Sequence, residues 1–263
     1  MRMNYIILVL TLALLSSTMP AQRLYTELIT DRPDKTESAV VVPFNAFQIE
    51  SGFLFQKQKY SENNVDVENE NLLIGSTLVR YGVSELFELR FGAEYFSGKS
   101  NKGGSESLFS GIQGIFIGSK IQLRRDKELL TDAAIIINYN LPYGNEKLRP
   151  ARFEPGIILS ASQYLDRRLS LGINLGFQNN SFKDRYEYFY SAAIGINVTE
   201  KFNAFLELYG DLNKGMAPNH FFDLGFTYLH MSNLQIDFSG GTILFGNKVD
   251  WFGSIGFAVR LPR

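Results

Sequence analysis

The sequence contains no cysteine among its 263 residues. Disulfide bonds, thiolate metal sites and cysteine nucleophiles are therefore excluded, and no lipid-modified cysteine can follow an export leader. Histidine is scarce as well, with only His220 and His230. There is no paired-histidine metal motif, no phosphate-binding loop and no nucleophile elbow. We therefore predict no metal, no cofactor and no catalytic residues, and we do not expect an enzyme.

Charge of one sign is also lacking. Twenty-six basic residues nearly balance twenty-seven acidic ones, and no basic tract is present. Nucleic acid is therefore not expected as a partner. After the N-terminal leader, no apolar run is long enough for a membrane-spanning helix.

The first 21 residues have the pattern of a secretory signal peptide. Arg2 precedes an apolar run from Tyr5 to Leu15, and small residues lead to Ala21. The apolar core is too short to span a bilayer as a helix. We predict cleavage before Gln22, with retention of the leader as an N-terminal anchor as the alternative.

The remaining chain consists of short segments in which apolar and polar residues alternate. Such alternation predicts strands with two different faces. Each segment is close to the roughly 9–11 residues that a tilted strand needs to cross a bilayer. The twelve predicted strands are 46–56, 71–81, 85–96, 107–120, 129–141, 151–164, 168–178, 187–198, 201–210, 219–230, 233–240 and 250–261.

The two faces differ in a way that favours a membrane barrel over a soluble sandwich. In 85–96, Phe87, Leu89 and Phe91 share one face, whereas Glu88 and Arg90 share the other. Ionic residues in mid-strand, opposite a continuous aromatic and aliphatic face, are typical of a barrel with lipid outside and water inside. We predict an all-β fold, a single antiparallel transmembrane barrel.

The predicted connections alternate in length. Tight turns are expected at 82–84, 124–127, 165–167, 199–200 and 231–232, and longer polar loops at 57–70, 97–106, 142–150 and 211–218. Short turns at the periplasmic rim and long loops outside the cell are the layout of outer-membrane barrels. Pro155 predicts a bulge or a strand end, because proline cannot donate to the ladder.

An ordered series of short motifs precedes and enters the first strand. It consists of Ile29-Thr30-Asp31-Arg32-Pro33-Asp34, then Thr36-Glu37-Ser38, Val42-Pro43 and Gln48-Ile49-Glu50-Ser51-Gly52-Phe53. This series resembles the start of a bacterial outer-membrane transporter family of the "MetA-pathway of phenol degradation" type, which is common in Bacteroidetes-like bacteria. The resemblance implies a barrel and transport, without identifying a substrate.

A set of polar residues falls on the predicted inner face. It comprises Glu50, Arg80, Glu88, Arg90, Glu94, Asp132, Asn138, Asn174, Glu207, Asp223, Asp237 and Arg260. On the lipid face, Arg or Lys at the midplane would cost roughly 2–4 kcal/mol each. Two interpretations remain open: the set pairs across the lumen and fills it, or it lines a path and sets selectivity. Carboxylates outnumber arginines, which favours cations or neutral polar solutes.

The motif in residues 30–38 consists of Asp31, Arg32, Pro33, Asp34, Thr36 and Glu37. Either the segment is a linker, or it folds into the periplasmic mouth of the barrel and pairs with wall charges. The second interpretation is favoured because the composition is not that of a flexible Gly/Ser linker. As partners of Arg32 we predict wall carboxylates such as Glu88 or Glu207.

These observations predict three parts: a signal peptide (1–21), a periplasmic segment (22–45) and an outer-membrane barrel (46–263) of a Gram-negative bacterium. The predicted function is a passive channel or uptake porin for small hydrophilic or amphipathic solutes. Lipid and the outer-membrane assembly machinery are the other expected partners. Two alternatives are a closed structural barrel with ligand-binding outer loops, and an outer-membrane hydrolase using His230 near Ser232.

Overall fold

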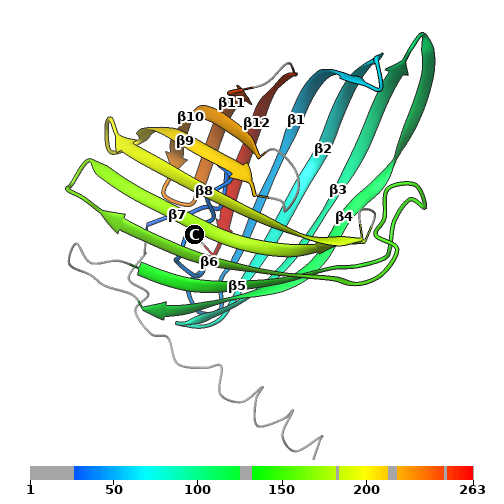
Figure 1. The fold of residues 1–263 in the computed structure, drawn as a ribbon. Coiled ribbons are helices and arrows are strands. Elements are labelled where there is room, and N and C mark those ends of the chain that lie inside the picture. The colour runs from blue at the N-terminus through cyan, green and yellow to red at the C-terminus, as the bar shows by residue number, and fades with distance from the viewer. Residues whose placement is uncertain (1–26, 125–131, 182–183, 213–217, 246–247, 263) are drawn as a thin grey trace, which may run out of the picture.

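The computed structural model describes residues 27–124, 132–181, 184–212, 218–245 and 248–262. It is a closed antiparallel barrel in which sequential strands pair and the last strand closes on the first (Figure 1). The strands are β1 (Phe47–Glu62), β2 (Val65–Ser84), β3 (Phe87–Lys102), β4 (Ser105–Arg124), β5 (Asp132–Asn140), β6 (Glu154–Tyr164), β7 (Leu169–Asn180), β8 (Arg185–Asn197), β9 (Phe202–Asp211), β10 (Asn219–Met231), β11 (Leu234–Ile243) and β12 (Val249–Leu261). The predicted all-β barrel of twelve strands is confirmed. The predicted leader, residues 1–21, lies outside the described residues.

None of the described residues forms a helix long and apolar enough to cross a membrane.

The two faces of the wall have opposite character. On β3, Arg90 is 4% exposed whereas its neighbour Phe91 is 47% exposed. The buried residues include many charges, and the exposed ones include most of the large apolar side chains. In a soluble protein the apolar side chains are buried and the charged ones exposed. The reverse arrangement seen here is typical of a barrel surrounded by lipid.

Two glycines shift the alternation within long strands. Gly75 in β2 and Gly114 in β4 have φ angles of 60° and 61°, and the strand registers shift near both. At such a bulge one extra residue enters the strand, so the inward side chains change from odd to even positions. The shift at Gly114 explains why this strand alternates poorly in the sequence.

The segments 57–70 and 97–106 were predicted as long loops, and this is wrong. β1 and β2 continue to a tight turn at Asn63 and Asn64, and β3 and β4 continue to one at Gly103 and Gly104. All four turn residues have positive φ, as two-residue hairpins require. The four strands therefore form a tall section that rises beyond the rest of the wall (Figure 1).

Charge pairs explain why the tall section remains a sheet after its apolar alternation stops. Lys57 Nζ lies 2.6 Å from Glu68 and 2.7 Å from Glu70, and Lys99 Nζ lies 2.8 Å from Glu106. Such cross-strand pairs stabilise a ladder that has water on both faces. A polar sequence was therefore mistaken for a loop.

The opposite rim carries short turns between β2 and β3, β6 and β7, β8 and β9, and β10 and β11; we call it the turn end. At one of these turns Asp166 accepts the backbone N–H groups of Arg168 and Leu169 at 2.6 and 2.7 Å, which lowers the pKa of its carboxyl. The loop predicted at 142–150 is present between β5 and β6, and Pro155 is the second residue of β6. Most of the connections predicted at 124–127 and 211–218 lies outside the described residues.

Candidate functional site

Residues 27–46, which we call the plug, lie inside the ring of strands near the turn end (Figure 1). Its later part is almost completely enclosed: Ala39, Val41 and Val42 are no more than 4% exposed. The plug then returns to the wall, where Asn45 donates its N–H to the carbonyl of Gly82 at 2.7 Å, and continues into β1. A segment at the start of the described chain thus occupies the lumen at one end of the barrel.

Asp31 is the centre of the strongest contacts between plug and wall. Its carboxylate lies 2.9 Å from Lys120 Nζ, 2.9 Å from Arg90 Nη1 and 3.3 Å from Arg80 Nη1. It also accepts the backbone N–H of Ser38 at 2.9 Å. Burial alone would raise the pKa of Asp31, but Arg80, Lys120 and Arg90 outweigh it and hold the pKa well below its usual range. Asp31 therefore carries a full negative charge when the plug is docked.

Arg80 connects this centre to the wall carboxylates. Its guanidinium donates to Glu88 at 2.9 Å and to Glu50 at 3.0 Å, and also to the plug carbonyl of Val40 at 2.9 Å. The two carboxylates accept plug backbone N–H groups in turn: Glu88 from Val42 at 2.7 Å and Glu50 from Asp31 at 2.9 Å. Few donors and acceptors are left unsatisfied, which a buried ionic cluster needs to be stable.

Arg32 points to a different part of the wall. Its Nη2 lies 2.9 Å from Asp237 Oδ1 on β11 and donates to Ser254 on β12 at 3.2 Å. The guanidinium rests on Gly52 and Gly256, where an added Cβ would overlap it. These two glycines face each other across β1 and β12, the strands that close the barrel. The absence of side chains there is what makes room for the arginine.

The side of the plug that faces β6–β9 is held by hydrogen bonds of its backbone and hydroxyl groups. Lys35 N–H donates to Glu207 at 2.7 Å, and Thr36 Oγ1 lies 2.7 Å from Ser191 Oγ. Glu37 N–H donates to Asn174 at 2.6 Å. The Glu37 side chain reaches across the lumen to Arg90 of β3, at 2.5 Å.

Asp34 lies in acidic surroundings. Glu207 of β9 and Asp223 of β10 are direct cross-strand neighbours on the inner face, and Asp34 lies close to both. Burial, followed by the charges of Glu207, Asp223 and Asp31, raises the pKa of Asp34 well above its usual value. The two aspartates of the plug therefore have opposite electrostatic environments.

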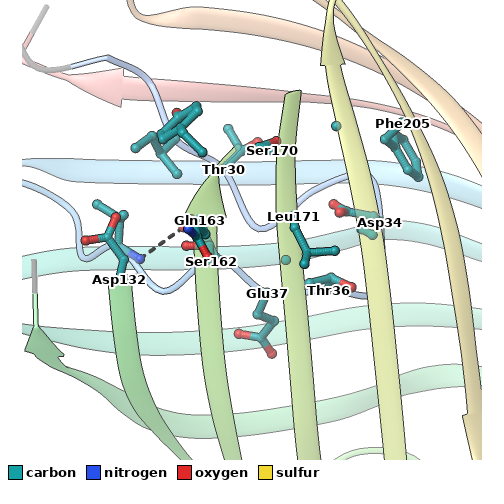
Figure 2. Close-up of a pocket in the computed structure, with 17 residues that line it drawn as sticks. Thr30, Asp34, Thr36, Glu37, Asp132, Ser162, Gln163, Ser170, Leu171 and Phe205 are labelled. Atoms are coloured by element: carbon teal, nitrogen blue, oxygen red, sulfur yellow. Dashed lines mark hydrogen bonds between the residues drawn. The ribbon is translucent and has the colours of Figure 1, made fainter. Parts of the chain in front are cut away.

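A cavity of about 200 Å³ separates the plug from the wall on the β5–β9 side. The plug contributes Thr30, Asp34 and Thr36, among others, and the wall contributes residues such as Ser162 and Phe205 (Figure 2). Beyond the plug, three inward aromatic rings lie against glycines of the adjacent strand. These pairs are Phe116 on Gly92, Phe189 on Gly176 and Phe252 on Gly241.

A family model described as "Putative MetA-pathway of phenol degradation" matches residues 30–261, which is most of the chain. The chain belongs to this family. The predicted membership is therefore confirmed, and the match includes residues 30–46 of the plug and all twelve strands. A comparison with curated protein sequences gives no match.

Two solved barrels are similar in fold. A crystal structure of an outer membrane channel from Pseudomonas putida F1 superimposes with a TM-score of 0.67 at 10% identity, and the alignment covers 89% of this chain and 100% of that one. The translocator domain of the autotransporter NalP from Neisseria meningitidis gives a TM-score of 0.55 at 9% identity, covering 82% and 88%. At these identities the likeness concerns the fold alone.

The residues predicted for the inner face fall into three groups. Glu50, Arg80, Glu88, Arg90, Asn174, Glu207 and Asp237 make the plug contacts given above. Asp223 lies beside Glu207, Arg260 donates to the carbonyl of Glu27 at 2.9 Å, and Asp132 borders the cavity. Glu94 and Asn138 lie farther along the lumen: Glu94 accepts from Gln113 at 2.9 Å, and Asn138 lies against Gly118.

The predicted partner of Arg32 is wrong. The arginine pairs with Asp237, whereas Glu88 binds Arg80 and Glu207 binds the plug backbone. The sequence does not fix how deep the plug lies or which way consecutive side chains point.

Other contact residues were missed by the sequence prediction. They are Gln48, Lys120, Gln122, Ser160, Ser191, Gln235 and Ser254. Lys120 and Gln122 share an inward face beyond the Gly114 bulge, so alternation counted backward from the turn end would have found them.

His230, the candidate of the hydrolase alternative, lies near the end of β10 with its ring centroid 6.3 Å from that of Tyr228.

Proposed function

We propose that the protein is a passive outer-membrane channel for small hydrophilic or amphipathic solutes, and that the plug restricts its periplasmic end. The observation that carries this proposal is the way the plug is held. Ion pairs and hydrogen bonds fix it inside the lumen, and it forms no strand of the barrel. Such contacts can dissociate while the wall remains closed, which is what a restricting segment needs.

The outer surface supports a place in the membrane. On β1 the outward residues from Phe47 to Phe55 are apolar except for Ser51, and the next outward positions are Lys57 and Lys59. The nine residues from Phe47 to Phe55, at about 3.3 Å each and tilted by about 40°, span about 23 Å. This is close to the apolar band of outer-membrane barrels, which is about 25 Å tall. The tall section then lies outside the cell and the plug faces the periplasm.

The comparisons support the same function. The family membership and the fold shared with an outer membrane channel from Pseudomonas putida both favour solute passage. Flow follows the solute gradient. We further propose that the chain is inserted by the outer-membrane assembly machinery, with lipid as its permanent partner.

A second candidate function is a closed barrel whose outer hairpins bind a ligand. The density of buried ion pairs around Asp31 favours this alternative, because it stabilises the closed state. Electrical conductance distinguishes the two functions.

The test is single-channel recording of the purified, refolded protein in planar bilayers. Three chains are compared: the native one, a deletion of residues 30–38, and a variant in which 30–38 is replaced by a Gly/Ser linker of equal length. We expect low current from the native chain and large current from both variants, since each removes the Asp31 and Arg32 contacts. A properly folded deletion variant without current would refute the channel and favour the closed barrel.

A further inference from the structure

The plug is held unequally on its two sides. Toward β2–β4, Asp31 forms ion pairs with three cations whose side chains are at most 2% exposed. Toward β6–β9, the turn formed by residues 34–38 offers backbone N–H groups and the Thr36 hydroxyl. The Glu37 carboxylate points the other way and pairs with Arg90 of β3. Breaking a buried ion pair leaves an uncompensated charge, whereas neutral groups can exchange their partners for water at a small net cost. On the β6–β9 side the turn is therefore held less strongly than Asp31 is on the other side, and its movement toward this wall breaks one ion pair, that of Glu37 with Arg90.

The cavity lies directly beside this turn. Part of its wall is made of small side chains. Ser162, Gly172 and Ala193 stand in one cross-strand row, and Ser170 and Gly195 stand in the next row toward the turn end. The volume of about 200 Å³ has room for several water molecules at about 30 Å³ each. The free space therefore lies between the wall and the 34–38 turn, on the side where the plug is held without ion pairs.

One row of contacts separates the cavity from the rest of the lumen. Asn174 and Ser160 bind the backbone of Glu37, and Ser191 binds the Thr36 hydroxyl. These wall residues form the next row away from the turn end. If the turn moves into the cavity, these contacts open and the cavity becomes continuous with the lumen, while Asp31 remains bound.

The cavity is lined by acidic side chains. Asp34, Glu37 and Asp132 border it, and none of the described residues that line it is Lys, Arg or His. In the docked plug the raised pKa of Asp34 and the ion pair of Glu37 with Arg90 reduce this negative charge, and Glu37 regains it when the turn moves away from Arg90. Hydroxyl groups of Thr30, Thr36, Ser162 and Ser170 also line the cavity. Carboxylate-lined constrictions favour cations and disfavour anions.

We propose that solutes cross the plugged end between the 34–38 turn and the β6–β9 wall, through this cavity, and that the passage favours small cations and neutral polar solutes over anions. The inference rests on the proposed channel function and adds its route and its selectivity. The anchored part of the plug stays in place during passage.

Cross-linking tests the route, because the natural chain has no cysteine. Thr36→Cys with Ser191→Cys ties the turn to β8 by a disulfide, because the two hydroxyl oxygens that the sulfur atoms replace lie 2.7 Å apart. Val41→Cys with Gln122→Cys is the matched control, because neither residue lines the cavity. It ties the anchored part of the plug to β4, where the Val41 N–H lies 3.4 Å from Gln122 Oε1, and a short bis-methanethiosulfonate joins the two thiols.

We expect the Thr36–Ser191 link to abolish the current and reduction to restore it, whereas the Val41–Gln122 link leaves the current unchanged. If both links abolish the current, the plug leaves as a unit and the proposed route is wrong. If neither does, the solute passes elsewhere. If neither the native chain nor its deletion variant carries current, the channel function itself is refuted. This result is obtained before any link is formed, so it is distinguished from a failure of the proposed route.

Thiol modification tests the selectivity. Ser162→Cys places a thiol in the cavity, and Ser107→Cys places one on the exposed part of β4 as a control for intrinsic reactivity. Relative to the control, we expect a cationic methanethiosulfonate to modify the cavity thiol faster than an anionic one and to reduce the current. Equal relative rates, or faster modification by the anion, would overturn the proposed cation preference.

Discussion

Asp31→Asn and Asp34→Asn form the most informative pair of variants. Both remove one negative charge from the plug, three residues apart, with almost no change in side-chain volume. Asp31 faces Arg80, Arg90 and Lys120, so its loss leaves buried cations unpaired. Breaking a buried pair in this way costs about 3–5 kcal/mol. Since about 1.4 kcal/mol corresponds to a factor of ten, the undocking equilibrium should rise by roughly two to four orders of magnitude.

Asp34→Asn should have the opposite effect on docking of the plug. Asp34 lies near Glu207 and Asp223, so removing its charge relieves repulsion and stabilises the docked plug. The assay is the open probability of single channels, with heat-dependent gel mobility as the check that each barrel has folded. We expect Asp31→Asn to be open far more often than the native chain and Asp34→Asn to be open less often. If both folded variants open the channel equally, the electrostatic account of docking is wrong.

Three further predictions test the arginine site, the lipid face and the pH dependence. Gly256→Val should displace Arg32 and increase the current, whereas Gly253→Val should leave the current unchanged, because no atom lies within 4 Å of a Cβ added there. Equal currents from the two variants would show that Arg32 does not depend on the space above Gly256. Phe91→Arg should reduce the folding free energy in bilayers by about 2–4 kcal/mol, measured by urea titration in lipid vesicles; native-like stability would place this residue off the lipid face. The pKa of Asp34 is higher in the docked plug than in the free one, so protonation of Asp34 stabilises docking. This stabilisation is complete below the free pKa of about 3.9 and is lost as the pH rises through the pKa of the docked plug. Open probability should therefore increase with pH, and a native profile retained in Asp34→Asn would exclude this carboxyl as the cause.

The membrane part of the wall could be predicted from the sequence because lipid imposes a strict alternation. Phe91 and Arg90 were placed on opposite faces from the pattern alone, and the exposed fractions agree. The tall section could not be predicted in this way. Outside the lipid both faces are polar, so Lys57 and Glu70 read as a loop although they pair across two strands.

The site was harder to predict than the wall. The motif in 30–38 indicated a segment folded into the mouth, but a motif carries no information about depth. Arg32 therefore could not be matched to Asp237, which is 205 positions away in sequence. The cavity was not predictable either, because the small residues of β6–β8 form continuous rows only after the register of three strands is known.

The position of Arg32 has a consequence for the order of assembly. Its acidic partner is on β11, its hydroxyl partner is on β12, and the surface beneath it is formed jointly by β12 and β1. This binding place does not exist until the two ends of the sheet have met. The plug precedes every strand in the chain, yet its arginine can bind only after the last strand has been added. Docking of Arg32 is therefore a late step of assembly and a local sign that the cylinder has been sealed.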